Sequence, residues 1–368
     1  MNSIIERAVR KAVNTYLQYI YLFGKSNNCR HHEETFDSSS FSAKGILAES
    51  FIAPVYKNRN GIVTIVSDDG DFQTGRIIDL LSQKYHVPFT IGGTVLNIAR
   101  HETWWKHTLK NNALMEIVNH SYNHVRMDSN SDIASNISRL THEIIHSKKY
   151  FESRFGNKQI CFVCPENMMC SEGYKLLRQS GVLAVRRGER GYNDLCLSPG
   201  EEPGELFNLK IKGIMDPTFS ESGKKKWLED ASNEKKWLIE MWHNICDHED
   251  GGFQTILTAD AESHLEEIME LADCGMLWPA RMTDALKYIF ERQCFESVAV
   301  VCGDNLLLSL YAKSESIDTA IFDHPLTVFV KNPGRKIIGA DSSAIIDNSV
   351  WYMVDVTPGT TRTLRLDQ

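Results

Sequence analysis

Short apolar runs alternate with helix-length amphipathic stretches through the middle of the chain. Seven runs have the length of strands and read GIVTIVS, PFTIGGTV, ALMEIVN, ICFVC, VLAVR, LFNLKIKG and WLIEMW. The stretches between them repeat apolar residues at an interval near 3.6, as in QTGRIIDLLSQKYH. Strand and helix in alternation predict a parallel sheet, and seven such strands suit a barrel of the α/β type. A doubly wound open sheet has the same periodicity and stays an alternative.

The pattern changes on both sides of this region. Residues 297–368 contain strand-like runs such as SVAVVC and LTVFVKN, turns at NPG and TPG, and no helical period, which predicts a small β-sandwich. The N-terminal 24 residues are amphipathic, and residues 25–50 are polar and rich in serine. We therefore expect an N-terminal amphipathic helix and polar linker (1–60), a barrel (61–293) and a C-terminal sandwich (297–368).

Ionisable and polar residues recur where the predicted strands end. In parallel α/β folds the carboxyl ends of the strands build the active site, so we expect these residues to share one mouth. They are Asp68, Asp69, His120, Pro165, Glu166, Asn167, Arg186, Arg187 and His243.

Asp68 and Asp69 stand side by side, although adjacent negative charges repel. Both can be ionised if a divalent cation neutralises one of them. His120 and His124 are four residues apart, and on one helical turn this spacing places both imidazoles on the same face. Two histidines and one carboxylate leave coordination positions open, which is typical of a catalytic metal site. A histidine pair alone is also common on helix surfaces.

Two motifs carry a family resemblance. Ser67-Asp68-Asp69-Gly70 resembles the first motif of the polysaccharide deacetylases (NodB homology, carbohydrate esterase family 4), and His120-Ser121-Tyr122-Asn123-His124 matches their second motif. The resemblance implies a distorted (β/α)7-type barrel and metal-dependent removal of N-acetyl groups from a glycan. It also implies that Asp68 is the general base, that Asp69, His120 and His124 hold the metal, and that His243 protonates the leaving amine.

The third and fourth motifs depart from the family pattern. FVCPENMM keeps Pro165 but has Val163 where the family has an arginine that orients the base. Either Arg186 or Arg187 replaces that arginine from the next strand, or the base is oriented differently. RRGERGYND, residues 186–194, lacks the usual aspartate, and its arginines suit an anionic substrate group. We assign Pro165, Glu166, Asn167, Arg186 and Arg187 to substrate binding; a solvated basic loop is the alternative for the two arginines.

Composition narrows the possible partners. A net charge of -8 and a pI near 5.9 argue against a nucleic-acid surface. Nine scattered cysteines suit free thiols in a reducing compartment, and the pair Cys161 and Cys164 is only a weak zinc signal. The apolar stretch 16–23 is too short to span a membrane. We expect a cytoplasmic protein, with peripheral membrane association as an alternative.

The sequence thus predicts hydrolysis of the N-acetyl group of an amino sugar in a glycan or a glycan precursor. The expected cofactor is one divalent metal ion, zinc first, with Co, Ni, Mn and Fe as alternatives. An amidohydrolase acting on a non-sugar amide, or a carbohydrate-binding protein without catalysis, are the rival interpretations. Trp351 and Tyr352 in the sandwich are either core residues or stacking residues for a sugar.

Overall fold

The structure is a computed structural model. It describes residues 46–128, 133–197, 205–213, 216–248, 252–313 and 321–367. The predicted N-terminal helix and the linker up to residue 45 lie outside these ranges. No helix of the described residues has the length and the apolar character that crossing a membrane requires.

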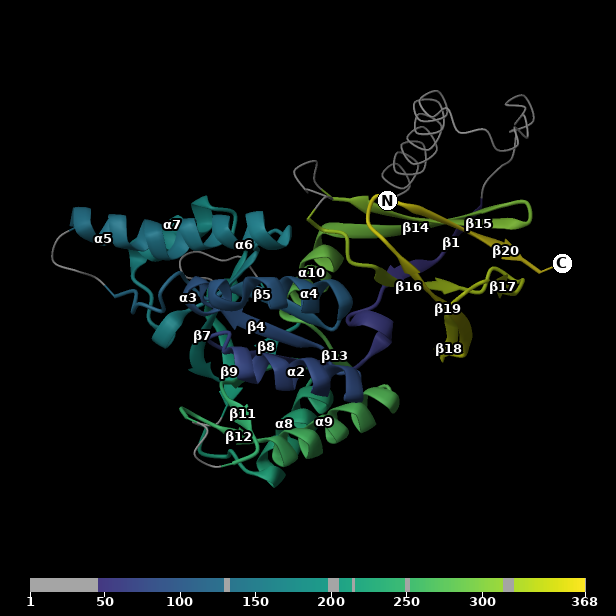
Figure 1. Cartoon of the computed structure of the whole chain (residues 1–368). Coiled ribbons are helices and arrows are strands. Elements are labelled where there is room, and N and C mark those ends of the chain that lie inside the picture. Colours follow the sequence, from purple (N-terminus) through teal and green to yellow (C-terminus); the bar gives the residue numbers. More distant parts are fainter. Residues whose placement is uncertain are drawn as a thin grey trace. The chain divides into compact units, whose positions relative to one another are not determined.

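Seven parallel strands close into a barrel, in the order β3-β4-β5-β6-β7-β9-β10 and back to β3 (Figure 1). All seven coincide with the predicted apolar runs, so the barrel is confirmed and the open sheet is wrong. The strands are β3 (Gly61–Ser67), β4 (Phe89–Gly93), β5 (Met115–Asn119), β6 (Cys161–Val163), β7 (Ala184–Arg190), β9 (Leu209–Gly213) and β10 (Lys236–Trp242).

The helices between and after these strands cover the outside of the barrel (Figure 1). They are α2 (Phe72–Tyr85), α3 (Val95–Ile98), α4 (Glu102–Asn111), α5 (Ile133–Leu140), a π-helix (Thr141–His146), α6 (Ser147–Phe155), α7 (Ser171–Gln179), α8 (Glu221–Asn233), α9 (Thr258–Asp273) and α10 (Met282–Cys294). Short 3-10 turns occur at Tyr56–Asn58, Ala99–His101, Pro165–Asn167 and Glu205–Asn208.

Strand β3 shows why the barrel strands read as continuous apolar runs. All seven of its residues are buried. Ile62 and Val66 pack in one hydrophobic cluster, whereas Val63 and Ile65 pack in another. Successive side chains of a strand point to opposite faces, so one set fills the interior and the other meets the helices.

The barrel is distorted beside β3. Strand β10 pairs with β3 along Ile62–Ser67, while β13 (Leu277–Pro279) pairs with its first half and β4 with its second half. Both β13 and β4 therefore lie on the edge of β3 opposite to β10. Three two-residue strands complete this region: β8 (Asn193–Asp194), β11 (Ile245–Cys246) and β12 (Ile256–Leu257).

The C-terminal region forms two antiparallel sheets, as predicted for a sandwich. One has the order β1-β14-β15-β20-β17 and the other β18-β19-β16-β2. Their strands are β1 (Ile46–Ala48), β2 (Ser50–Ile52), β14 (Phe295–Cys302), β15 (Asn305–Ala312), β16 (Leu326–Lys331), β17 (Ile337–Ile338), β18 (Ser342–Ile346), β19 (Ser349–Val356) and β20 (Thr361–Leu366).

Residues 46–52 differ from the sequence interpretation, which placed them in a linker. Strand β1 pairs with β14, and β2 pairs with β16, so this segment belongs to the sandwich. Each strand is only three residues long, which is too short to show an alternating pattern. Trp351 and Tyr352 are both 9% exposed, on opposite faces of β19, which favours their interpretation as core residues.

Helix α10 joins the barrel to the sandwich through buried contacts. The Tyr288 hydroxyl donates to the carbonyl of Ala53 (3.0 Å), and the ring of Tyr56 lies 5.2 Å from that of Trp278. Glu291 is fully buried, and its Oε1 accepts from the amide of His324 (3.1 Å). Burial raises the pKa of Glu291 to about 8, even though this hydrogen bond lowers it.

Glu291 predicts a pH-dependent loss of stability. Its folded pKa of about 8 exceeds the ordinary value of 4.5, so between these values the folded state binds more protons than the unfolded state. Stability is therefore highest below the lower value and falls as the pH rises towards the upper one, by up to about 1.4 kcal/mol per pH unit. Glu291→Gln should remove this contribution, and denaturant unfolding from about pH 5 to about pH 8 measures it.

Glu296→Gln, at an exposed position of β14, is the matched control and should follow the wild type at every pH. If the Glu291→Gln curve also ran parallel to the wild type, Glu291 would be ionised in the folded protein and this interpretation of its burial would fail.

Candidate active site

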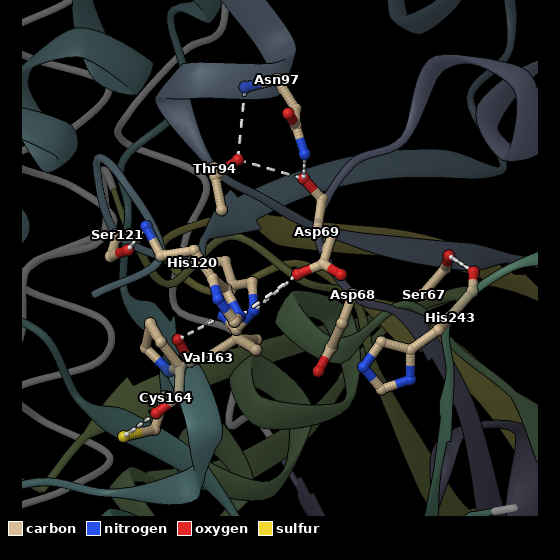
Figure 2. A network of polar contacts seen from close by, with 12 residues as sticks. Ser67, Asp68, Asp69, Thr94, Asn97, His120, Ser121, Val163, Cys164 and His243 are labelled. Atoms are coloured by element: carbon tan, nitrogen blue, oxygen red, sulfur yellow. Dashed lines mark hydrogen bonds and ion pairs between the residues drawn. The ribbon is translucent and has the colours of Figure 1, made fainter. Parts of the chain in front are cut away.

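The turn after β3 directs two adjacent carboxylates to different partners. Asp69 has a φ of 72°, and Gly70 has a φ of 71°. The left-handed region is unfavourable for a residue with a Cβ, so other contacts must hold Asp69 there. The Asp69 carbonyl accepts from Thr94 Oγ1 (3.2 Å) and from Asn97 Nδ2 (3.1 Å). The carboxylates of Asp68 and Asp69 consequently point in different directions (Figure 2).

Asp69 faces two imidazoles. Its Oδ1 lies 3.5 Å from His120 Nε2 and 3.2 Å from His124 Nε2. One ligand atom from each of the three residues falls within 4.8 Å of the others. Burial alone would raise the pKa of Asp69, but the histidines around it lower the pKa to about 2, so the side chain is a carboxylate at neutral pH.

The tautomer of His120 shows that these three residues fit a metal. His120 Nδ1 lies 2.8 Å from the carbonyl oxygen of Val163, and a carbonyl only accepts, so Nδ1 carries the proton. In the neutral imidazole, which is the form that binds a metal, the Nε2 atom is then an acceptor that faces Asp69 Oδ1, a second acceptor. Both atoms are buried without a hydrogen-bond partner. Two buried acceptors turned towards each other are costly unless a cation lies between them.

His124 completes the group from the same loop. Burial and the neighbouring His120 keep the pKa of His124 below its ordinary value, and the nearby carboxylates oppose this only in part. The imidazole is therefore mainly neutral at neutral pH, which is the form that binds a metal.

The segment that carries both histidines is a loop, so the helical turn expected from their spacing is wrong. Ser121 and His124 have φ values of 77° and 60°, which no α-helix contains. The amide of Ser121 donates to Asn119 Oδ1 (2.9 Å), and the amide of His124 donates to Ser121 Oγ (3.0 Å). Side-chain acceptors thus replace the backbone bonds of a helix.

Glu143 holds this loop from outside the barrel, and the sequence interpretation missed it. Its Oε2 accepts from the amides of Tyr122 (3.1 Å) and Asn123 (2.8 Å), and its Oε1 accepts from Asn123 Nδ2 (2.9 Å). Glu143 is only 2% exposed and lies in the π-helix Thr141–His146. Its sequence context, THEIIH, gives no sign of this role, because an acid within an amphipathic helix normally faces solvent.

Asp68 points to an arginine inside the barrel. Arg186 Nη2 contacts both carboxylate oxygens of Asp68, at 2.6 Å for Oδ1. Asp68 is 5% exposed, and Arg186 is fully buried. Arg186 Nη1 also lies 3.4 Å from Asn167 Oδ1, so Asn167 supports the guanidinium. The guanidinium of Arg186 is thus buried against Asp68, and its assignment to substrate binding stays a prediction.

Arg186 lies on the strand next to the altered third motif. Val163, which stands where the family arginine is expected, pairs in register with Arg186 on the neighbouring strand. The arginine is therefore supplied at the same level of the barrel, one strand further on. The absence of a side chain at Gly92 on β4 leaves room for Asp68 and Val163, because a Cβ there would lie 3.2 Å from both Asp68 Oδ1 and Val163 Cγ1.

The remaining predicted residues lie around this centre. Arg187, next to Arg186 on β7, points away from the interior towards the ring of Tyr174, 6.0 Å from its centroid. Pro165 is buried, whereas Glu166 is exposed and its charge acts on His124. The carboxylate of Glu166 is thus open to solvent beside His124.

His243 lies at the end of β10, beside Asp68 (Figure 2). Its carbonyl accepts from Ser67 Oγ (3.1 Å), and the amide of Asp68 donates to the carbonyl of Trp242 (2.9 Å), so the ends of β3 and β10 are tied together. Burial lowers the pKa of His243, although the charges of Asp68 and Asp69 raise it in part. Its Nδ1 is buried without a partner and is free to carry a proton.

The cysteines do not contribute to this centre. All eight cysteines within the described ranges are free, and Cys161, Cys164 and Cys170 are buried. Cys164 Sγ lies 2.9 Å from the carbonyl of Met168, to which it donates as a thiol. Burial raises the pKa of the Cys164 thiol to about 12, which disfavours the thiolate that zinc requires.

Comparison with known proteins gives similarity of structure only. No protein-family model and no curated protein matches the sequence. A Mycobacterium smegmatis structure described as a candidate polysaccharide deacetylase matches with a TM-score of 0.48 and 15% identity, over 66% of this chain and 95% of that one. The family 4 carbohydrate esterase (CE4) domain of a xylanase from the hindgut metagenome of Trinervitermes trinervoides has a TM-score of 0.41 and 15% identity, over 62% and 90% of the two chains.

A wild-type CE4 pseudoenzyme from Bacillus anthracis matches with a TM-score of 0.41 and 15% identity, over 64% of this chain and 69% of that one. The resemblance is distant at these values, so the chemistry of this site rests on its own side chains. The structures that this chain resembles are polysaccharide deacetylases and other proteins of carbohydrate esterase family 4, the family whose motifs the sequence resembles.

Proposed function

We propose that the protein is a metal-dependent hydrolase that removes the N-acetyl group of an amino sugar in a glycan or a glycan precursor. The observation that carries this proposal is the set of acceptor atoms of Asp69, His120 and His124, which converge within 4.8 Å at the mouth of the barrel. Beside them lie a carboxylate held by an arginine and a histidine with a free ring nitrogen. Together these groups supply what hydrolysis of an unactivated amide requires.

A divalent ion held by Asp69, His120 and His124 would supply Lewis acidity, which polarises a carbonyl group and acidifies water. Zinc suits two neutral imidazoles and one carboxylate, and cobalt, nickel, manganese and iron accept the same ligands. The adjacent Asp68 is not needed as a ligand, because Arg186 already engages both of its oxygens.

In this proposal Asp68 acts as the general base. The proton of the attacking water passes to its carboxylate as the water oxygen bonds to the amide carbon. Arg186 is a positioning residue, since its guanidinium fixes the orientation of the Asp68 carboxylate. His243 then gives a proton to the amide nitrogen, the carbon–nitrogen bond breaks, and acetate and the free amine leave. A buried imidazole with a lowered pKa is a stronger acid in its protonated form, which suits this step.

Metal content is the first test of the proposal. Protein purified without chelators should contain about one equivalent of divalent metal per chain by elemental analysis. His120→Ala should abolish binding, because it removes a ligand whose orientation Val163 fixes. The exposed His107→Ala serves as the control and should keep the metal. Absence of metal from the wild type even after reloading with zinc would contradict the assignment of the site.

Asp68→Asn tests the base. Acetate release from N-acetylglucosamine oligosaccharides should fall by about 10² to 10⁴, the usual contribution of a general base. Metal content should stay at the wild-type value, because Asp68 Oδ1 and Oδ2 contact Arg186 instead of the metal ligands. Full activity in this variant would exclude Asp68 as the base. If the wild-type protein released acetate only from non-sugar amides, the amidohydrolase interpretation would be favoured instead.

Arg186→Met tests the buried ion pair. Removing the arginine leaves Asp68 buried without its partner, which typically costs about 3 to 5 kcal/mol of stability. We expect a lower melting temperature and a loss of kcat, while the KM for the same oligosaccharides changes little. The double variant Val163→Arg/Arg186→Val returns an arginine to the same level of the barrel and should restore part of kcat. Unchanged kcat in Arg186→Met would show that Asp68 needs no positioning.

A further inference from the structure

Three exposed apolar side chains border the candidate active site. Large apolar side chains of the described part of the barrel are exposed at five positions, and Leu96 (43%), Met168 (38%) and Phe253 (67%) are three of them. Leu96 and Met168 each precede or follow, in the sequence, a residue that makes a hydrogen bond within the site, and the ring of Phe253 contacts the ring of His243. We call them the apolar rim. Exposed apolar residues that gather around a polar cleft are a recurrent feature of binding sites.

The backbone at Leu96 and Met168 adjoins the site through hydrogen bonds of these residues or their neighbours. The Leu96 amide donates to the carbonyl of Tyr122 (2.9 Å), within the loop of the two metal-ligand histidines. The next residue, Asn97, donates to the carbonyl of Asp69. Met168 directly follows Asn167, which lies against Arg186. The backbone of the apolar rim therefore lies close to the site at two positions.

Phe253 is the largest member of the rim and contacts His243 directly. The two ring centroids lie 5.1 Å apart with an interplanar angle of 88°. The Phe253 carbonyl accepts from Asn244 Nδ2 (2.9 Å), and the Gly252 carbonyl accepts from Thr255 Oγ1 (3.0 Å). Gly252 has a φ of 107°, which favours glycine. These contacts hold the ring of Phe253 beside the proposed proton donor while two-thirds of it stays open to solvent.

The metal-ligand group itself is open. The side chains of Asp69 and His124 are 37% and 36% exposed. Water competes for every hydrogen bond at such a surface, so polar contacts alone discriminate weakly between bound sugar and solvent. The apolar face of a pyranose ring loses hydration when it covers an aromatic ring. This contribution to the binding free energy does not require a closed pocket.

We infer that Phe253 is a specificity-determining residue that binds the face of a sugar ring next to His243, with Leu96 and Met168 contacting the neighbouring part of the same glycan. This inference rests on the proposed function, because it identifies the substrate as a carbohydrate with an exposed pyranose face. It predicts that an oligosaccharide binds more tightly than the monosaccharide, since the rim reaches beyond the residues that engage the acetamido group.

Calorimetry on the full-length, zinc-loaded Asp68→Asn protein tests the inference without turnover. The ligands are N-acetylglucosamine, its dimer and its tetramer. Phe253→Ala in this background should raise the Kd for the tetramer about tenfold, the size of one aromatic contact. Phe253→Tyr should keep the affinity. Phe51→Ala removes an exposed aromatic ring from the sandwich and should leave the Kd unchanged.

The outcomes separate this inference from the proposed function. Tetramer binding that depends on Phe253 supports the inference even if the wild type releases no acetate. In an active enzyme with Asp68 restored, Phe253→Ala should raise KM and leave kcat nearly unchanged. A fall in kcat at constant KM would instead mean that Phe253 only supports His243 and would overturn the inference. Equal affinities of the Phe253→Ala and Phe51→Ala proteins, or binding to phosphatidylcholine vesicles in place of the tetramer, would also overturn it.

Discussion

The site depends on how the backbone of Asp69 is held after β3. Two neighbouring carboxylates in an extended chain would alternate between the inside and the outside of the barrel, and only one would reach the mouth. The left-handed conformation of Asp69 turns the chain so that one carboxylate enters the barrel and the other faces the histidine loop. The hydrogen bonds from Thr94 and Asn97 to the Asp69 carbonyl hold this conformation in place. The start of α3 therefore stabilises the turn that separates the two acids.

The two adjacent carboxylates therefore lie in different surroundings. Asp68 is surrounded by the barrel interior, where a buried guanidinium compensates its charge. Asp69 is at the rim, where its Oδ1 and the Nε2 atom of His120 are buried without a hydrogen-bond partner. Arg186 thus compensates the charge of Asp68 from within the chain, whereas Asp69 and the two histidines form a group that could hold a metal ion. The arginine that compensates Asp68 stands on β7, in register with Val163 of β6.

Much of this could be predicted from the sequence, because it depends on local patterns. The seven barrel strands are continuous apolar runs, and the residues that follow Ser67, Asn119 and Trp242 are polar where the run ends. The loop around His120 could not be predicted, because its shape depends on Glu143, a residue distant in sequence. The short strands β1 and β2 were missed for a similar reason, since three residues form a strand only when a partner strand supplies the hydrogen bonds.

These two strands change how the chain is divided. The sandwich takes β1 and β2 from before the barrel and its other strands from after it. In topological terms the barrel is an insertion between the second and third strands of the sandwich. During synthesis the first two strands emerge early, but they cannot pair with β14 and β16 until the whole barrel has left the ribosome. The barrel can fold as a unit in that interval, because the pairing of β13 with the start of β3 already joins its two ends, whereas the sandwich closes last.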